Sequence, residues 1–174
     1  MSQLTKAPLR TIGNLTFAKS LEDALKIPNY IIESLPENLQ LKQHLYKEIE
    51  DISIDTIILS STSGFKPTNL QKHMKNPTNL IVTHPFNPVY LMPLVEVVPG
   101  QARDQNIIDD VQHLLEYIGM VPIIIKKEID AFVADRMLEA MWREALWLVK
   151  DDICTTKELD DIITSSFGIR FAQM

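Results

Sequence analysis

A histidine and a glutamate stand where an open α/β sheet could use them for acid–base chemistry. His84 follows the apolar run 80–83 and opens a proline-rich loop, and such sheets bind ligands beyond the carboxyl ends of their strands. A histidine there titrates near neutrality and acts as a general base if a carboxylate orients its other ring nitrogen. Glu96 interrupts the apolar run 94–98 and is the candidate carboxylate, because a buried acid needs a partner. The alternative is that His84 only ends the strand and Glu96 faces water at an edge.

Two other turns carry polar side chains that could bind a substrate or a cofactor. Ser61, Thr62 and Ser63 follow the next apolar strand upstream, where their hydroxyls could hold a substrate oxygen or simply form the turn. Glu37 and Lys42 follow a proline, and the local pattern favours the solvated start of a helix with the acid near its N-terminus.

These residues need a scaffold, and the hydrophobic pattern predicts one. Short β-branched runs alternate with helical stretches up to about residue 126, which predicts a layered α/β domain. Five of the ten prolines lie between Pro77 and Pro99, so the loop after His84 cannot be helical. The predicted strands are 15–18, 29–33, 56–60, 80–83, 94–98 and 121–126. A short helix is predicted from Ser20, and longer helices over 38–51, 67–74 and 104–118. Gly119 is the residue expected to stop the last of them.

The pattern changes near Glu128, where we place a domain boundary. One long helix is predicted from Asp130 to about Lys150, apolar around most of its circumference, as in a helix bundle or a subunit interface. Thr155 starts a further helix through a capping box and this helix fades near Ser165. On the long helix, the pair Asp135-Arg136 is expected at the polar edge, and Trp142 and Trp147 in the core rather than in a cation-binding cage.

Composition excludes several classes of protein. The formal net charge is −6 and the sequence pI about 5.2, without the basic excess that nucleic-acid binding requires. The N-terminus has no apolar leader core, and no apolar run approaches the roughly 18 residues of a membrane span. We therefore expect a cytoplasmic protein with neither a nucleic acid nor a membrane as partner.

Cysteine and glycine counts narrow the chemistry further. The single cysteine, Cys154, allows neither an internal disulfide nor a multi-thiolate zinc site, and no metal site is expected. None of the five glycines is spaced to form G-x-G-x-x-G or a P-loop, the common phosphate-binding turns.

Several segments together resemble the 3-hydroxyacyl-CoA dehydrogenase family, and the resemblance runs from about Leu15 to the last residue. The histidine segment is the longest and most specific of them. The segments are 32–39 (IESLPENL), 59–64 (LSSTSG), 84–98 (HPFNPVYLMPLVEVV), 131–136 (AFVADR), 142–146 (WREAL) and 168–174 (GIRFAQM).

The resemblance implies roles for these residues. His84 would take the hydroxyl proton as hydride passes to NAD, Glu96 would orient His84 and stabilise the imidazolium, and Ser63 would bind the substrate hydroxyl or the nicotinamide end. Asn87 would contact the carboxamide of the cofactor, and the pair Glu37 and Lys42 would line its ribose side.

The family likeness also implies a fold, a substrate class and an assembly. The fold would be an incomplete Rossmann-type doubly wound sheet (1–127, part of an NAD-binding domain) followed by a truncated helical domain (128–174). Asp135 stands where acyl-CoA enzymes of the family usually have asparagine, and a carboxylate suits a trimethylammonium substrate such as carnitine, with a 3-hydroxyacyl compound as the alternative. An aromatic residue, Tyr90 or a tryptophan of the long helix, is also expected to help hold that cation. The helical domain would form a homodimer.

Family members begin with a strand and a G-x-G-x-x-G turn that this chain does not contain. Three interpretations follow: an oxidoreductase completed by a further N-terminal piece, a catalytically inactive remnant, or an interaction module built on the tryptophan-rich helix. The last does not explain the spacing of His84, Glu96 and Ser63. Without the strands of that segment, the strand predicted at 15–18 would have no neighbour and the sheet would expose an apolar edge.

Overall fold

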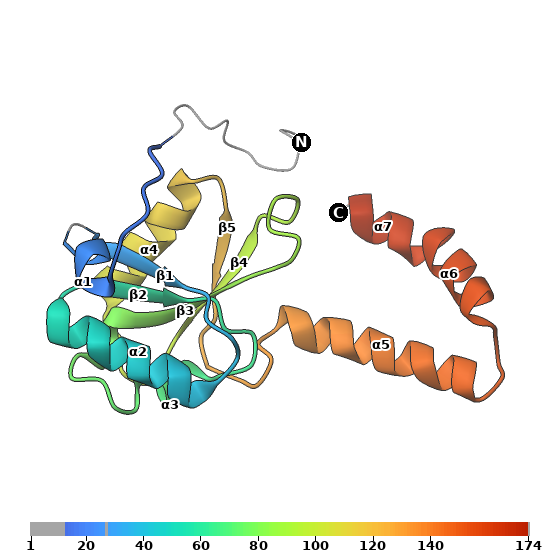
Figure 1. Ribbon diagram of the computed structural model, residues 1–174. Coiled ribbons are helices and arrows are strands. Elements are labelled where there is room, and N and C mark those ends of the chain that lie inside the picture. Colours follow the sequence, from blue (N-terminus) through green and yellow to red (C-terminus); the bar gives the residue numbers. More distant parts are fainter. Residues whose placement is uncertain (1–12, 27, 174) are drawn as a thin grey trace. The chain divides into compact units, whose positions relative to one another are not determined.

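The computed structural model describes residues 13–26 and 28–173. The chain divides into two compact units, and the division falls between Val133 and Ala134. The first unit is built around a β-sheet, and the described residues of the second form helices (Figure 1). The fold is therefore a mixed α/β sheet followed by a short helical domain.

Five strands form one sheet in the described part of the first unit, in the spatial order β1-β2-β3-β4-β5. β1 (Tyr30–Glu33), β2 (Ile57–Ser60) and β3 (Leu80–Pro85) are parallel to one another. β4 (Leu94–Pro99) runs antiparallel to β3, and β5 (Val121–Ile124) is parallel to β4. The carboxyl ends of β1 to β3 and the amino ends of β4 and β5 therefore meet at one edge of the sheet, which we call the carboxyl edge.

Helices cover both faces of this sheet (Figure 1). On one face, Tyr46 and Ile49 of α2 and Leu70 of α3 form a buried core with strand residues such as Val82 and Val98. On the other face, α4 packs through a second core cluster that includes residues of β2, β3 and β4. The helices of this unit are α1 (Leu21–Ala24), α2 (Leu39–Ile52), α3 (Pro67–Gln71) and α4 (Gln105–Tyr117), with a 3-10 turn at Pro77–Asn79.

Capping residues define the ends of the two long helices of the first unit. The Asn38 side chain accepts a hydrogen bond of 3.1 Å from the Leu41 N–H at the start of α2, and Asp104 accepts one of 2.8 Å from the Asn106 N–H at the start of α4. After α4 the chain turns at Gly119, whose φ of 89° is left-handed and suits glycine. The helices predicted at 38–51 and 104–118 and the stop at Gly119 are confirmed.

The second unit contains α5 (Ala134–Lys150), α6 (Thr156–Thr164) and α7 (Phe167–Gln173). The predicted capping box is present: the Thr155 hydroxyl accepts the Glu158 N–H, and the Glu158 carboxylate accepts the Thr155 N–H. α6 ends before Ser165, as expected, but α7 was not predicted.

The strand predicted at 15–18 is wrong. These residues have no regular secondary structure, and the side chains of Leu15 and Phe17 are 83% and 91% exposed. A strand forms only where a neighbour satisfies its backbone groups, and in the described residues β1 pairs with β2 alone. β1 is therefore an outer strand among the described residues, and its Ile32 is 71% exposed.

The long helix was also predicted to begin too early. α5 starts at Ala134 rather than at Asp130, because Ala131 and Phe132 adopt the left-handed conformation, with φ of 59° and 50°. Burial of its apolar residues in a core is not observed either, since Trp142 and Trp147 are 59% and 49% exposed and none of the described α5 residues is buried. Two other elements are shorter than predicted, with α3 ending at Gln71 and β5 at Ile124.

Among the described residues, no helix has the length and apolarity to cross a membrane. The same part of the chain holds no group of three or more histidine, cysteine, aspartate or glutamate side chains that could bind a metal ion.

Candidate active site

Four polar residues at the carboxyl edge share one face of the sheet. Glu33 ends β1, Ser60 ends β2, His84 lies near the end of β3 and Glu96 near the start of β4. Because side chains alternate along a strand, all four project to the face covered by α2 and α3, as Val82 does. In the sheet Glu33 is paired with Ser60, and His84 with Glu96. Each of the four is at most 4% exposed, so their polar atoms must be satisfied inside the protein.

His84 and Glu96 form a buried hydrogen-bonded pair. Nδ1 of His84 lies 3.0 Å from Oε2 of Glu96, and both side chains are buried. A carboxylate oxygen accepts hydrogen bonds, so this contact suits the tautomer of His84 that carries a proton on Nδ1. The alternative in which Glu96 faces water is excluded. The pair has the arrangement of a general base with its orienting acid.

Residues 132 and 133 complete the surroundings of the pair. The Phe132 ring packs against the His84 ring, with the centroids 5.2 Å apart and the planes tilted by 47°. The Val133 N–H donates a hydrogen bond of 2.9 Å to Oε1 of Glu96. Each oxygen of Glu96 therefore has a defined partner.

Glu33 is the centre of a second buried cluster beside the pair. Lys42 of α2 donates to Oε1 at 2.7 Å, and the Leu35 N–H donates to the same oxygen at 2.6 Å. Tyr46 and Ser60 donate to Oε2 at 2.5 and 2.7 Å. Lys42 is 1% exposed, so the prediction of a solvated helix start is wrong for this residue. α2 places Lys42 and Tyr46 on one side because they are four residues apart.

Glu37 joins this cluster to the turn after β2. The Nζ of Lys42 is 3.5 Å from Oε2 of Glu37, while Oε1 accepts the Thr62 hydroxyl and, at 2.9 Å, the Gly64 N–H. A Cβ at Gly64 would lie 3.3 Å from Oε1 of Glu37, so a glycine allows the close approach. The Thr62 hydroxyl also accepts the Phe65 N–H at 3.1 Å, which confirms it as a turn-forming residue. The Glu37 side chain remains 42% exposed and reaches solvent.

Two pKa shifts describe the electrostatics of this cluster. Burial raises the pKa of Glu33, but the hydrogen bonds from Lys42, Tyr46, Ser60 and the Leu35 N–H outweigh it, and the pKa of Glu33 lies below its usual range. Burial, followed by the hydrogen bond to the Glu33 carboxylate, raises the pKa of the Tyr46 phenol well above its usual value. Glu33 is therefore ionised and Tyr46 neutral near pH 7.

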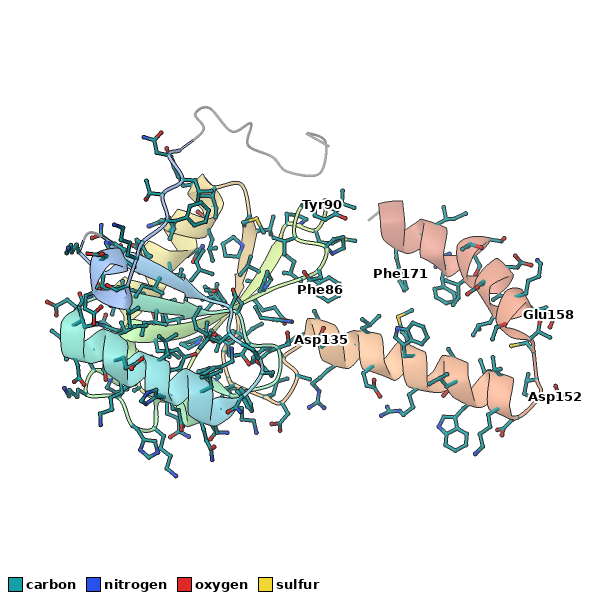
Figure 2. The ribbon with its side chains drawn as sticks, in the orientation of Figure 1. Phe86, Tyr90, Asp135, Asp152, Glu158 and Phe171 are labelled. Carbon is teal, nitrogen blue, oxygen red and sulfur yellow. The ribbon has the colours of Figure 1, made fainter. Side chains whose placement is uncertain are left out.

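Two predicted site residues lie on loops at the same edge. Ser63 is exposed on the turn after β2, and Asn87 is exposed on the loop after β3, where the Asn87–Pro88 peptide bond is cis. Tyr90 lies on the same β3–β4 loop and is 67% exposed (Figure 2). Loops that follow parallel strands thus carry their side chains to the carboxyl edge.

The remaining predicted residues belong to the second unit. Asp135 is half-buried in the first turn of α5, two residues after Val133 in the chain. Nζ of Lys150 lies 3.9 Å from the centroid of the Trp147 ring, so a cation of the chain itself occupies one face of this tryptophan.

Sequence reasoning assigned no role to Glu33, Tyr46, Ser60 or Phe132. For Glu33 a signal existed, because it is a titratable residue at the end of an apolar strand, as His84 is. For the other three no local signal exists, since each acquires its role from a partner far along the chain.

Comparison with known proteins defines the class to which this fold and site belong. Residues 2–129 match the family described as "3-hydroxyacyl-CoA dehydrogenase, NAD binding domain", and residues 132–174 match "3-hydroxyacyl-CoA dehydrogenase, C-terminal domain". The chain belongs to the 3-hydroxyacyl-CoA dehydrogenase family, and the resemblance inferred from its motifs is confirmed.

Within this family the chain is similar to L-carnitine dehydrogenases. It is 51% identical to the L-carnitine dehydrogenase of Mesorhizobium japonicum, over 99% of this chain and 48% of that protein. It is 49% identical to an L-carnitine dehydrogenase/betainyl-CoA thioesterase of a Rhizobium species, over 99% of this chain and 35% of that protein. The chain thus spans between about a third and a half of the length of these relatives.

A solved structure shows the same fold. The crystal structure of 5-formyl-3-hydroxy-2-methylpyridine 4-carboxylic acid 5-dehydrogenase, an NAD⁺-dependent dismutase, superposes with a TM-score of 0.87 at 31% sequence identity. The match covers 95% of this chain and 54% of that chain.

Proposed function

We propose that the chain is part of a cytoplasmic, NAD-dependent dehydrogenase that oxidises the 3-hydroxyl group of L-carnitine to 3-dehydrocarnitine. The observation that carries this is the buried His84–Glu96 pair at the carboxyl edge, in a chain about half identical to L-carnitine dehydrogenases. The family membership supports NAD as the cofactor.

The chemistry of the pair suits removal of a hydroxyl proton. Nε2 of His84 would accept the proton of the substrate O–H, and Glu96 would stabilise the imidazolium through Nδ1–H. The C–O single bond becomes a carbonyl as the carbon loses its hydrogen with both electrons. NAD, when bound, supplies the acceptor for that hydride.

The residues at the carboxyl edge fit a nucleotide cofactor. One carboxylate oxygen of Glu37 accepts hydrogen bonds from the Thr62–Gly64 turn. The side chain is 42% exposed, so Glu37 can also accept hydrogen bonds from the hydroxyl groups of a ribose. Lys42 lies beside it but is already neutralised by Glu33. We propose that Glu37 and Lys42 line the ribose side, that Asn87 contacts the carboxamide, and that Ser63 binds the substrate hydroxyl or the nicotinamide end.

A titration with NADH tests the cofactor. Micromolar binding of NADH by the 174-residue chain, measured through the fluorescence of NADH, would support the proposal. Binding that is absent up to millimolar NADH would favour the alternative of a catalytically inactive remnant for the 174 residues taken alone.

Asp135 tests the substrate class. If its carboxylate attracts the trimethylammonium group, Asp135→Asn should raise KM for L-carnitine about tenfold, equivalent to about 1.4 kcal/mol, and leave KM for NAD unchanged. Faster turnover of a 3-hydroxyacyl-CoA than of carnitine by the wild type would favour the acyl-CoA alternative.

We also propose that the chain forms homodimers through its helical unit. α5 presents large apolar side chains to solvent, among them Met137, Trp142 and Leu146, which are 64%, 59% and 62% exposed. Apolar patches of this kind are typical of interaction surfaces. Light scattering after size-exclusion chromatography should give twice the monomer mass of 19.9 kDa, and a monomer at micromolar concentration would contradict the proposal.

A further inference from the structure

The segment that joins β5 to α5 has an uncommon backbone beside the His84–Glu96 pair. Ala131 and Phe132 have φ of 59° and 50°, in the left-handed region that residues with a side chain seldom adopt. Two consecutive residues in this conformation persist only where the surrounding structure holds them.

Contacts on the N-terminal side anchor the segment to α3 and the turn before it. The Glu128 carboxylate accepts the Thr68 N–H at 2.9 Å, and the Asp130 carboxylate lies 2.8 Å from Nζ of Lys66. Both contacts join residues about sixty positions apart in the sequence. The chain is thus fixed just before it turns toward the pair.

Phe132 then inserts its side chain into the core. It is 1% exposed and belongs to the same buried cluster as Val82 and Val98, which flank the pair on β3 and β4. Its ring lies against the His84 ring at 5.2 Å between centroids. An imidazole packed in this way has few rotamers open to it.

The next residue contacts the partner of the histidine. The Val133 N–H donates to Oε1 of Glu96 at 2.9 Å, while Oε2 of the same carboxylate lies 3.0 Å from Nδ1 of His84. The hydrogen bond at Oε1 fixes the plane of the carboxylate, and that plane determines the direction in which Oε2 meets the ring.

We propose that the Phe132 ring and the Val133 N–H position the His84–Glu96 pair and hold His84 in the single tautomer that carries its proton on Nδ1. Nε2 is then the basic nitrogen. Phe132 is a positioning residue here, because it acts through His84. This inference rests on the proposed role of His84 as the base, but the state of the ring can be measured without cofactor or substrate.

The test is the ¹⁵N spectrum of His84 in the 174-residue chain at about pH 8, above the usual histidine pKa. The wild type should show one tautomer, with Nδ1 protonated. Phe132→Leu keeps an apolar side chain but removes the ring, and we expect it to populate the Nε2–H tautomer to about one tenth or more. A wild type with mixed tautomers, or a Phe132→Leu variant with unchanged ¹⁵N shifts, would overturn the proposal.

Ile49→Ala is the matched control. Ile49 lies on α2, is 1% exposed and belongs to the same core cluster as Phe132, so its truncation loosens the same core. The tautomer of His84 should be unchanged in this variant. An equal mixture in Ile49→Ala and Phe132→Leu would show that general core packing, and not the ring contact, sets the tautomer, and the proposal would fail.

A measurement on the wild type covers the case in which Phe132→Leu does not fold. The Val133 amide should exchange with solvent at least about tenfold more slowly than the amide of the exposed residue Ser63. Free exchange of the Val133 amide would overturn the proposal. Because neither readout uses NAD or substrate, the result of the NADH titration and the result of this test are independent of each other.

Discussion

At the scale of single residues, Glu33 is the point on which the buried hydrogen bonds of the carboxyl edge converge. Four donors reach its two oxygens, and one of them is the ammonium of Lys42. Burying two charges costs much of what their attraction returns, so the pair adds little net stability compared with an apolar replacement. Removing one partner is different, because the other charge then stays buried and uncompensated.

Glu33→Gln should therefore destabilise the protein strongly. We expect the free energy of unfolding to fall by about 3 kcal/mol or more, measured by urea denaturation followed by circular dichroism. The double variant E33Q/K42M, which removes both charges, should recover part of the loss.

Asp51→Asn is the matched control for this change. Asp51 also pairs with a lysine, Lys75, but both side chains are at least half exposed. Its substitution should change stability much less. Equal effects of the two substitutions would contradict the role assigned to burial.

The lowered pKa of Glu33 also predicts a dependence of stability on pH. A carboxyl group with a lower pKa in the folded state stabilises the fold above its unfolded pKa of about 4.3, and this contribution is lost as pH falls through the folded pKa. As the pH is lowered below about 4.5, the urea concentration at the unfolding midpoint should decrease for the wild type. It should decrease less steeply for Glu33→Gln. Parallel curves would show that other carboxylates dominate the acid response.

At the scale of elements, the start of α5 is set by backbone conformation and not by helix propensity. Ala131 and Phe132 interrupt a sequence that otherwise reads as helix from residue 130, and the helix begins only at Ala134. A left-handed residue with a Cβ costs about 1–2 kcal/mol. Phe132 offsets this through burial of its ring, whereas Ala131, only partly buried, has little side chain to bury.

Ala131→Gly should therefore stabilise the fold. Relief of the left-handed cost exceeds the extra chain entropy of glycine, about 0.5–1 kcal/mol, so we expect a gain of about 0.5 kcal/mol in the free energy of unfolding. Ala140→Gly, in the middle of α5, is the control and should cost up to about 1 kcal/mol of helix stability. A loss of stability in Ala131→Gly would contradict the expected balance.

At the scale of the whole molecule, burial is distributed unevenly. The first unit has two core clusters on the two faces of its sheet, whereas none of the described residues of α5 and α6 is buried. Helices that bury no apolar face owe little stability to packing.

Hydrogen exchange should report this difference directly. Amides of Val82 and Val97, in the centre of the sheet, should exchange at least about a hundredfold more slowly than those in the middle of α5. If α5 is as protected as the sheet, its apolar face is covered, and loss of that protection on dilution would support the proposed homodimer.

Local signals were sufficient for most elements of the first unit. The apolar runs of β2 to β5, the Asn38 and Asp104 caps and the glycine at 119 depend on neighbours within a few residues, so their positions are predictable. The failures at 15–18 and 130–133 have the opposite cause. Pairing at 15–18 requires a neighbouring strand, and the conformation at 131–132 depends on a core built from distant segments.

For the site, the sequence by itself determined which residues can do chemistry and at which strand ends they stand, and it identified the family. His84 and Glu96 are recognisable from types and order alone. Only the tertiary structure decided that they touch: β4 returns antiparallel to β3, which pairs the two residues in register on one face. It also decided that Lys42 is buried on Glu33 and that Phe132 contacts His84. The physical reason is that burial and hydrogen-bond partners are supplied by segments remote in the chain, which no local pattern encodes.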